Sequence, residues 1–261
     1  MRRQALLIGC GKMGGALLER WVLSERYEFS VVDPVAESVP EGAHLFRTAE
    51  ALRGQKFDLI IIALKPQMID QFVPEYAEYL VPSGLLVSIA AGYAVERLRA
   101  HFASVPTIRL MPNLPASIGR GVNGLFATPD VSAKDRKDIT DLMDLTGLSI
   151  WVESEDVLDR VTVLASCGVG FFFEIARSFV AAAGALDFGP DQARELVLTA
   201  FSGAADLAIR SDLDLATLRN NVTSKNGVTQ AGLEQLRQDG ILDSLTLQTF
   251  QAAYARAVEL R

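Results

Sequence analysis

The sequence predicts an α/β domain with a mostly parallel sheet, followed by an all-α domain. Nine of the ten prolines lie at or before Pro129, and only Pro190 lies beyond it. The early part alternates short Val/Ile/Leu runs with amphipathic stretches, which is typical of strands buried on both faces and joined by helices. The later part consists of long Ala/Leu/Val-rich stretches. We therefore expect two domains, residues 1–154 and residues 155–261.

The elements of the first domain follow from these runs. Unrelieved apolar runs predict strands at Ala5–Ile8, Phe29–Asp33, Leu59–Leu64, Leu85–Ile89, Thr107–Leu110, Gly121–Ala127 and Ser149–Val152. The amphipathic stretches between them predict helices at Gly14–Leu23, Met68–Tyr79, Val95–Phe102 and Ala133–Leu145. Strands that alternate with helices form βαβ units, so the sheet should be parallel along most of its width.

The second domain is predicted to be helical. Its long apolar stretches place helices at Val157–Ala165, Phe171–Ala185, Asp191–Ile209, Gln230–Arg237 and Leu245–Leu260. Pro190 follows Gly189 and marks a helix start, because proline is favoured in the first turn of a helix. The stretch Phe171–Ala185 is apolar on almost every side, which is typical of a core helix or of an interface between subunits.

Charge and composition exclude several classes of protein. The chain has 25 basic and 32 acidic side chains, a formal net charge of -7, whereas nucleic-acid partners require clustered Lys and Arg. Cys10 and Cys167 are far apart and lie in no Cys/His cluster, so we expect neither a disulfide scaffold nor a metal site. No run of 18 apolar residues occurs, so we expect a cytoplasmic protein without a membrane partner.

A glycine-rich motif follows the first predicted strand and opens the first predicted helix. It reads Gly9-Cys10-Gly11-Lys12-Met13-Gly14, a GxGxxG sequence. The first glycine permits a tight turn, the second lets the backbone approach a pyrophosphate, and the third lets the helix pack on the strand. The motif predicts a Rossmann-like dinucleotide-binding domain in which these residues contact the cofactor. A plain glycine-rich turn is the alternative.

Asp33 ends the second predicted strand, 24 residues after Gly9. This is close to the usual spacing for an acidic residue that binds the adenosine ribose hydroxyls. A carboxylate repels a 2′-phosphate and no arginine follows Asp33, so we expect NADH to be preferred over NADPH. The alternative is an ordinary turn residue before Pro34.

Two further loops follow strands of the predicted sheet. Ala63-Leu64-Lys65-Pro66 closes the run at 59–64, and Met111-Pro112-Asn113 follows the run at 107–110. Open α/β folds bind ligands at the carboxyl ends of their strands. We therefore expect Ala63, Lys65, Met111 and Asn113 near the cofactor, although Lys65 also fits an ordinary solvated loop lysine.

One polar, turn-rich segment interrupts the helical domain at residues 220–229, with the sequence NNVTSKNGVT. It precedes a predicted helix, and the free N–H groups of a helix entry suit a carboxylate or phosphate ligand. The hydroxyls of Ser224 and Thr229 could add to them. Simple N-capping by Thr229 is the alternative.

These motifs together resemble the pyrroline-5-carboxylate reductases, which make proline from its cyclic imine with NAD(P)H. The likeness covers nearly the whole chain, in IGCGKMGGAL, IIALKPQ, SIAAGY, RLMPNLPASIGRG and LRNNVTSKNGVTQAGLEQL. The resemblance implies a Rossmann domain followed by a helical domain that forms a homodimer or higher oligomer. It also implies that the helical domain lends its polar loop to the active site.

The resemblance assigns roles to individual residues. The cofactor would be held by Gly9, Gly11, Lys12, Met13, Gly14, Asp33, Ala63, Lys65, Met111, Asn113 and Asn221. The substrate carboxylate would bind Ser224 and the backbone of Gly227 and Val228. Thr229 would act as the catalytic residue, with its hydroxyl directed at the imine nitrogen. A protonated imine is already electrophilic, so no strong acid is required.

The sequence departs from the family pattern at the expected substrate end. Lys225 and Asn226 replace Pro-Gly, Val228 replaces a threonine, and residues 165–170 read ASCGVG where members read SGSGPA. These departures keep two alternatives open: a reductase of another cyclic imino acid, and a non-catalytic nucleotide-binding regulatory protein. A β-hydroxyacid dehydrogenase is disfavoured, because residues 156–187 contain no lysine to act as its general acid/base.

Overall fold

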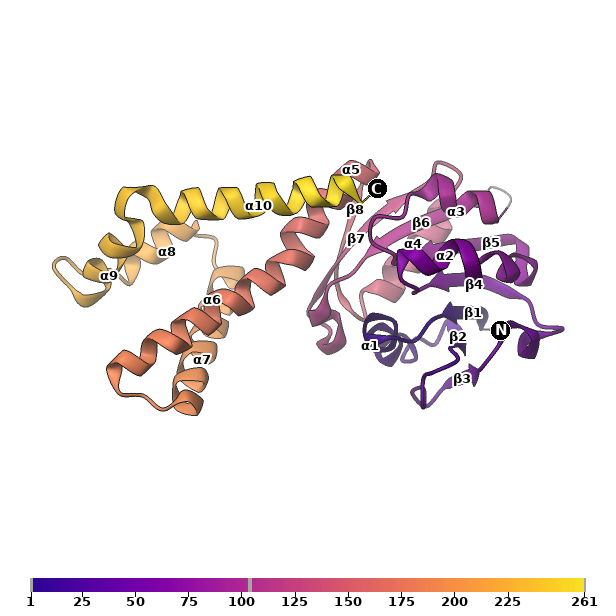
Figure 1. Cartoon of the computed structure of the whole chain (residues 1–261), viewed down its shortest axis with the longest axis horizontal. Coiled ribbons are helices and arrows are strands. Elements are labelled where there is room, and N and C mark those ends of the chain that lie inside the picture. Colours follow the sequence, from indigo (N-terminus) through magenta and orange to yellow (C-terminus); the bar gives the residue numbers. More distant parts are fainter. Residues whose placement is uncertain (1, 103–104, 261) are drawn as a thin grey trace. The chain divides into compact units, whose positions relative to one another are not determined.

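The computed structural model describes residues 2–102 and 105–260 (Figure 1). The chain divides into two compact units. The first unit comprises Met1–Cys167 together with Ala253–Arg261, and the second comprises Gly168–Ala252. The expected boundary at 154/155 coincides with the start of a helix that packs within the first unit, and its placement stays a prediction.

The first unit is built on one sheet. In the described part of the chain it has eight strands in the order β3-β2-β1-β4-β5-β6-β7-β8. All neighbouring pairs in this part are parallel except the pair β6 and β7, which is antiparallel. The strands are β1 Arg3–Ile8, β2 Tyr27–Val32, β3 Ala43–Phe46, β4 Phe57–Ile62, β5 Leu80–Ser88, β6 Thr107–Met111, β7 Gly121–Ala127 and β8 Gly147–Val152. The predicted α/β class with a mostly parallel sheet is confirmed.

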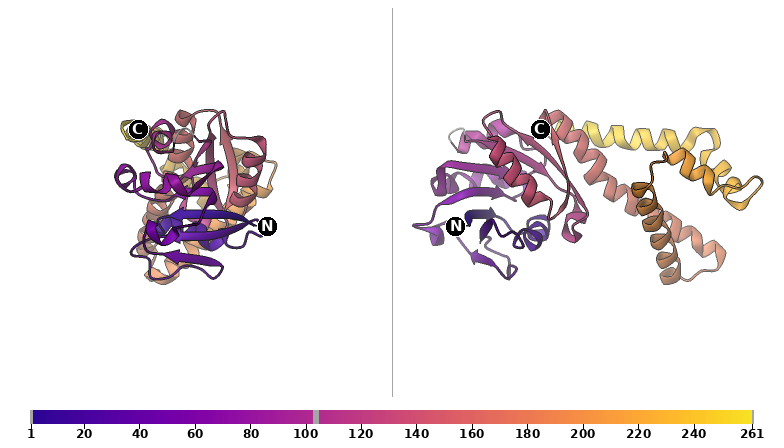
Figure 2. Two further views of the ribbon diagram at one scale, coloured as in Figure 1. Left: turned by 90° about the vertical axis from the view of Figure 1, so that its right-hand side faces the viewer. Right: turned by 180° about the vertical axis from the view of Figure 1, so that it is seen from behind.

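Helices cover both faces of this sheet (Figure 2). They are α1 Lys12–Trp21, α2 Pro66–Phe72, α3 Val95–His101, α4 Ala133–Met143 and α5 Glu155–Val161. Alternate residues of each strand feed two cores, since Leu7 packs with α1 and α4 while the adjacent Ile8 packs with α2 and α3. This alternation explains why the central strands read as unbroken apolar runs.

One predicted helix of the first unit is wrong in detail, and one strand is absent from the predictions. The stretch Met68–Tyr79 is not one helix, because Pro74 ends α2 near Phe72 and starts a separate 3-10 helix at Pro74–Tyr79. Strand β3 was not predicted, since its four half-exposed residues give a weak apolar signal. β3 forms the edge of the sheet next to β2, and the segment after it contributes to the site below.

The second unit contains only helices among its described residues. They are α6 Gly168–Ala183, α7 Pro190–Arg210, α8 Leu215–Asn221, α9 Val228–Arg237 and most of α10, Ile241–Glu259. The predicted start at Pro190 is confirmed, with Gly189 as the N-cap. Phe201 of α7 packs against Phe172 and Phe179 of α6, with ring centroids 5.8 and 5.0 Å apart.

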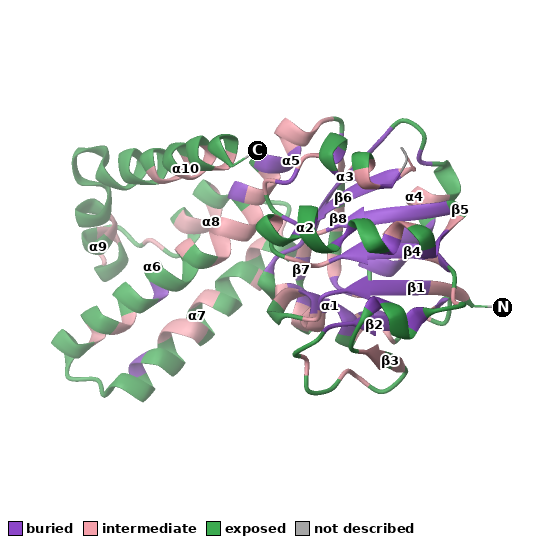
Figure 3. Ribbon diagram, turned by 45° about the vertical axis from the view of Figure 1, so that its right-hand side comes forward, coloured by how far each residue is buried: buried purple, intermediate pink, exposed green. Residues whose placement is uncertain are grey.

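The helices of the second unit are exposed along most of their length (Figure 3). Phe173, Ile175 and Phe179 of α6 are 54%, 50% and 45% exposed. The continuous helical stretch Glu155–Leu186 is long and apolar enough, by length and composition alone, to cross a membrane, and an 18-residue window of it has a mean hydropathy of 1.5. Glu174 and Arg177 interrupt this stretch, so it contains no uninterrupted run of 18 apolar residues.

The end of α10 belongs to the first unit. The hydroxyl of Tyr254 donates to Oδ1 of Asp156 at 2.6 Å, and Arg160 lies over the Tyr254 ring. Leu260 lies against Gly92, where a Cβ would come within 2.6 Å of the Leu260 carbonyl oxygen. The first unit is therefore assembled from two separate segments of the chain.

Candidate functional site

The glycine loop joins β1 to α1 at the carboxyl edge of the sheet. Gly9 has a φ of +91°, and a Cβ there would lie 2.8 Å from Leu64 Cδ2 and 2.9 Å from the Ala63 carbonyl oxygen. Only glycine suits such a position. Helix α1 begins at Lys12 with Gly11 as N-cap and no side chain capping it. Its first N–H groups thus remain available to an anion.

The loop leaves room for a ligand at the helix entry. A Cβ at Gly11 would meet no atom within 4 Å. Lys12 is exposed, Met13 is half-buried, and Gly14 is buried. The structure therefore brings the predicted glycine-loop residues together around an open helix N-terminus, an arrangement that fits a dinucleotide pyrophosphate.

Asp33 follows β2 and lies beside this loop. Its Oδ2 accepts the N–H of Cys10 at 2.7 Å, and its Oδ1 accepts the N–H groups of Val35 and Ala36 at 2.8 and 2.9 Å. Burial raises the pKa of Asp33, but these three N–H groups and Arg47 outweigh that effect and hold the pKa below its ordinary value. Asp33 therefore carries a full negative charge, and it also organises the turn that the alternative interpretation expected.

Arg47 was not predicted from the sequence. It follows β3, and its Nη1 donates to the carbonyl oxygen of Asp33 at 3.2 Å and also to that of Ala36. No arginine directly follows Asp33 in the sequence, but Arg47, which lies 14 residues further along the chain, is beside Asp33 in the structure. The expectation that no arginine is near Asp33 is therefore wrong. Recognising β3 would have placed Arg47 at this edge of the sheet.

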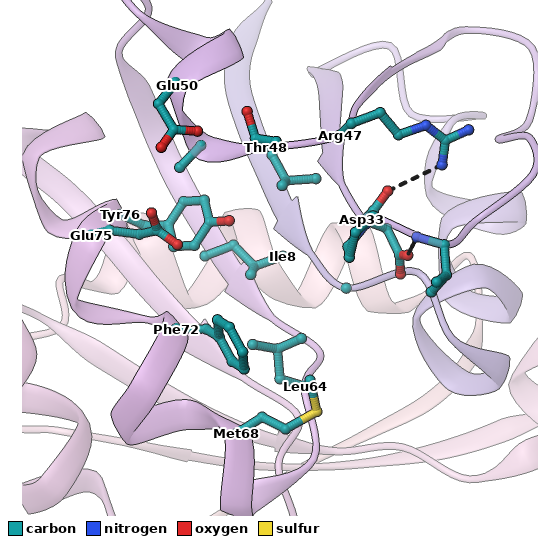
Figure 4. Close-up of a pocket in the computed structure, with 15 residues that line it drawn as sticks. Ile8, Asp33, Arg47, Thr48, Glu50, Leu64, Met68, Phe72, Glu75 and Tyr76 are labelled. Atoms are coloured by element: carbon teal, nitrogen blue, oxygen red, sulfur yellow. Dashed lines mark hydrogen bonds between the residues drawn. The ribbon is translucent and has the colours of Figure 1, made fainter.

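A cavity of about 350 Å³ extends from Asp33 across the sheet edge (Figure 4). Its walls come from the ends of β1 and β2, the turns that follow β2 and β3, helix α2 and the 3-10 helix after it. The lining residues are Ile8, Gly9, Val32, Asp33, Pro34, Val35, Arg47, Thr48, Ala49, Glu50, Leu64, Met68, Phe72, Glu75 and Tyr76. A mostly apolar slot with a carboxylate at one end fits the adenosine half of a dinucleotide.

Ala63 and Lys65 lie next to the glycine loop. The N–H of Ala63 donates to the Ile8 carbonyl oxygen at 2.8 Å, which places the ends of β1 and β4 side by side. Lys65 is exposed at the N-cap position of α2, and Pro66 is the first residue of that helix. The predicted position of Lys65 at the carboxyl end of a strand is thus observed.

Met111 and Asn113 lie at the end of β6, where the loop is braced from both sides. Asn113 is 4% exposed, and its Nδ2 donates to the Ala165 carbonyl oxygen at 3.1 Å while its Oδ1 accepts the Val122 N–H at 2.9 Å. Ser166 donates to the Pro112 carbonyl oxygen at 3.1 Å. Because the Asn113 oxygen and one of its two amide N–H groups are engaged inside the protein, we expect the backbone of this loop, more than the Asn113 side chain, to face the cofactor.

The brace comes from a π-helical turn at Thr162–Cys167, which overlaps the segment 165–170 discussed in the sequence analysis. Turns of this kind occur often at functional sites. This contact is not predictable from residue types, because Ala165 acts only through its backbone carbonyl. Cys167, the last residue of this turn, is half-buried.

Arg109 anchors β6, the strand that leads into this loop. It is 1% exposed, and its Nη1 lies 2.6 Å from Oε1 of Glu155. The same oxygen of Glu155 accepts the Val95 N–H at 3.1 Å. This ion pair joins β6 to the first turn of α5 and to α3.

The polar segment of the second unit forms a tight entry to α9. Asn226 has a φ of 58°, and its N–H donates to Oε1 of Gln230 at 2.8 Å. Asparagine tolerates this left-handed conformation better than most residues. The Gly227 N–H donates to the Ser224 carbonyl oxygen at 3.0 Å, and a Cβ on Gly227 would overlap Ser224 Oγ. The loop therefore holds the Ser224 hydroxyl directly against the start of the helix.

The interpretation of Thr229 as an N-cap is wrong. Gly227 is the N-cap of α9, no side chain caps that helix, and Thr229 is its second residue. The structure brings Ser224, Gly227, Val228 and Thr229 together at one exposed helix entry, and Val228 is 93% exposed. Asn221 ends α8 at the other end of the same loop.

Both parts of the chain match models of known families. Residues 155–260 match pyrroline-5-carboxylate reductase dimerisation, and residues 5–92 match NADP oxidoreductase coenzyme F420-dependent. The pyrroline-5-carboxylate reductase of Haemophilus influenzae is 33% identical over 261 residues, which cover 97% of this chain and 96% of the relative. That of Pseudomonas aeruginosa is 33% identical over 78% of this chain and 74% of the relative.

Solved structures of similar fold cover nearly the whole chain. A pyrroline-5-carboxylate reductase from Coxiella burnetii has a TM-score of 0.89 and 26% identity, and it covers 100% of this chain and 99% of its own. The Plasmodium falciparum pyrroline carboxylate reductase with NADP bound has a TM-score of 0.88 and 21% identity, over 99% and 98% of the two chains. Because the Haemophilus relative is 33% identical over nearly the full length of both chains, the chain belongs to the pyrroline-5-carboxylate reductase family.

Proposed function

We propose that the protein reduces the C=N bond of 1-pyrroline-5-carboxylate to L-proline with a nicotinamide cofactor. The observation that carries the proposal is the uncapped glycine loop of α1 beside the Asp33 cavity, in a chain that belongs to this reductase family. Such a loop and cavity match the two ends of an adenosine diphosphate group.

The residues present fit the cofactor. We assign the pyrophosphate to Gly9, Gly11, Lys12, Met13 and Gly14, and the adenosine ribose to Asp33. Ala63, Lys65, Met111, Asn113 and Asn221 are assigned to the nicotinamide half. When bound, the reduced nicotinamide supplies a hydride to the imine carbon.

The helix entry of α9 is assigned to the substrate. Ser224 and the backbone N–H groups of Gly227 and Val228 would hold the carboxylate, because a helix N-terminus favours an anion. Thr229 would orient the ring nitrogen through its hydroxyl. Positioning and charge complementarity then supply most of the rate, since the iminium is already electrophilic.

We further propose that NADH is preferred over NADPH. The charged carboxylate of Asp33 at the cavity would repel a 2′-phosphate, although Arg47 beside it reduces that repulsion. The test compares kcat/KM for the two cofactors in the wild type and in Asp33→Asn. A wild-type ratio that favours NADPH would contradict the preference.

The exposed apolar face of α6 supports a homodimer or a higher homo-oligomer formed through the helical unit. Residues 155–260, which match the family's dimerisation region, include this face. We propose that a partner subunit covers it, and that the enzyme acts in the cytoplasm. Light scattering coupled to size-exclusion chromatography measures the oligomeric state directly.

The decisive experiment follows the oxidation of NADH and NADPH by nicotinamide absorbance, with racemic pyrroline-5-carboxylate as substrate. Substrate-dependent oxidation is expected. A series of cyclic imino acids with smaller and larger rings tests the departures at residues 165–170 and 225–228. Turnover of another ring size alone would favour a different imine reductase, and cofactor binding without any turnover would favour a regulatory protein.

A further inference from the structure

One wall of the Asp33 cavity carries a tyrosine hydroxyl that forms no hydrogen bond within the described residues. Tyr76 lines the cavity and is only 5% exposed. Within residues 2–102 and 105–260 its hydroxyl forms no hydrogen bond, and Figure 4 shows it directed into the cavity. This hydroxyl is therefore available to a ligand.

Carboxylates lie on the same wall. Glu75 precedes Tyr76 in the chain, and both line the cavity with Glu50. Partial desolvation and the nearby Glu50 raise the pKa of Glu75, which is an exposed residue at the rim of the cavity. The wall thus offers a hydroxyl donor next to a carboxylate acceptor, at the opposite end of the cavity from Asp33 (Figure 4).

The floor between the two ends is apolar and suits a flat ring. Leu64, Met68 and Phe72 line it, and Met68 and Phe72 are 36% and 39% exposed despite being apolar. A ring that covered them would remove this surface from water.

We infer that Tyr76 and Glu75 recognise the base of the cofactor and select adenine over bases with a 6-oxo group. Adenine presents a ring-nitrogen acceptor, N7, beside its N6 amino donor. The Tyr76 hydroxyl donates to the acceptor, and the Glu75 carboxylate accepts from the amino group. Hypoxanthine has a carbonyl oxygen in place of the amine, which the Glu75 carboxylate repels. The inference rests on the proposed function, because it takes the cavity to hold the adenosine half.

Binding measurements test the inference without the substrate. We would titrate the protein with NADH and with reduced nicotinamide hypoxanthine dinucleotide, following nicotinamide fluorescence. Wild type should bind NADH about tenfold more tightly, the value of one or two hydrogen bonds. Glu75→Gln should bring the two Kd values within about twofold of each other, because an amide can donate to the 6-oxo group.

Tyr76→Phe provides a second readout. It should weaken NADH binding about fivefold, the value of one hydrogen bond, and it should leave the Tm of the ligand-free protein unchanged, because the hydroxyl has no protein partner there. A purely structural role for the hydroxyl would lower that Tm instead. In turnover, the KM for NADH should rise while kcat stays constant.

Glu78→Gln, an exposed neighbour outside the cavity, serves as the matched control and should change neither Kd.

The outcomes separate the inference from the proposed function. If NADH binds but Tyr76→Phe and Glu75→Gln leave both Kd values unchanged, base recognition by these residues is overturned while the reductase proposal stands. If the folded wild-type protein binds neither dinucleotide, the reductase proposal fails and the inference fails with it.

Discussion

The two units of the chain bury their apolar side chains to very different extents. Of the core side chains in the described residues, only Ala176 and Ala193 come from Gly168–Ala252, whereas the sheet unit supplies all the rest. The sheet unit thus holds its own core. The helical unit leaves large residues such as Phe173 and Ile175 uncovered, so we expect its stability to depend on the partner subunit proposed above.

The largest effect is expected from a substitution that prevents the helical units of two subunits from associating. Phe173→Glu places a carboxylate on the apolar face of α6, where a partner would have to bury it. Burying an unpaired charge costs about 3–5 kcal/mol, so we expect monomers by light scattering and loss of helix by circular dichroism. NADH binding by the sheet unit should survive. Glu174→Ala, which removes an exposed ion pair with Arg177, should leave the oligomeric state unchanged.

The next effect concerns the sheet unit itself. Glu155→Ala leaves the buried guanidinium of Arg109 without its partner at 2.6 Å. We expect a loss of about 3 kcal/mol in the free energy of unfolding, measured by urea denaturation. The exposed neighbour substitution Glu153→Ala should change the midpoint little. Equal midpoints for the two variants would show that the Arg109 pair contributes nothing to stability.

A smaller effect is expected at the helix entry of the second unit. Thr229→Ala should lower kcat about 10- to 100-fold, equivalent to about 1.4–2.7 kcal/mol, because only one orienting hydroxyl is lost. Thr229→Ser should restore most of the rate. Wild-type turnover in Thr229→Ala would remove this residue from the mechanism, and stopped activity in Thr229→Ser would indicate a steric role.

The smallest effect is a pH dependence that distinguishes the sheet unit. The folded pKa of Asp33 is below its ordinary value, so its contribution to stability is fully present above the unfolded pKa of about 3.9. That contribution disappears as the pH falls through the lower folded pKa. The difference in free energy of unfolding between wild type and Asp33→Asn should therefore be constant from about pH 7 to pH 5 and shrink below about pH 4. A difference that grows on acidification would contradict the assigned direction.

The sequence predicted those parts of the fold whose signal is local. The run Ala5–Ile8 and the glycine motif identify β1 and the entry of α1, because a buried strand and a glycine turn leave direct traces in residue type. Pro190 marks α7 for the same reason. Strand β3 left no such trace, since its residues are partly exposed at the sheet edge.

The missing parts of the candidate site depend on contacts between distant residues. Arg47 reaches Asp33 only because β3 pairs with β2, and Asn113 is occupied only because a π-helical turn more than fifty residues away presents the Ala165 carbonyl. In the sequence Tyr76 has the character of an ordinary core aromatic, and only the fold places the cavity beside its hydroxyl. Residue type alone carries no information on such partners.

The return of α10 to the first unit makes the nucleotide-binding half discontinuous along the chain. Its last segment, from Ala253, reaches Asp156 and Gly92 only after the 85 residues Gly168–Ala252 have been synthesised. During translation the first unit must therefore wait, with these surfaces uncovered, until the whole helical unit has left the ribosome. The entropy of closing so long a loop grows only slowly with its length, so the delay affects the timing of folding more than the final stability.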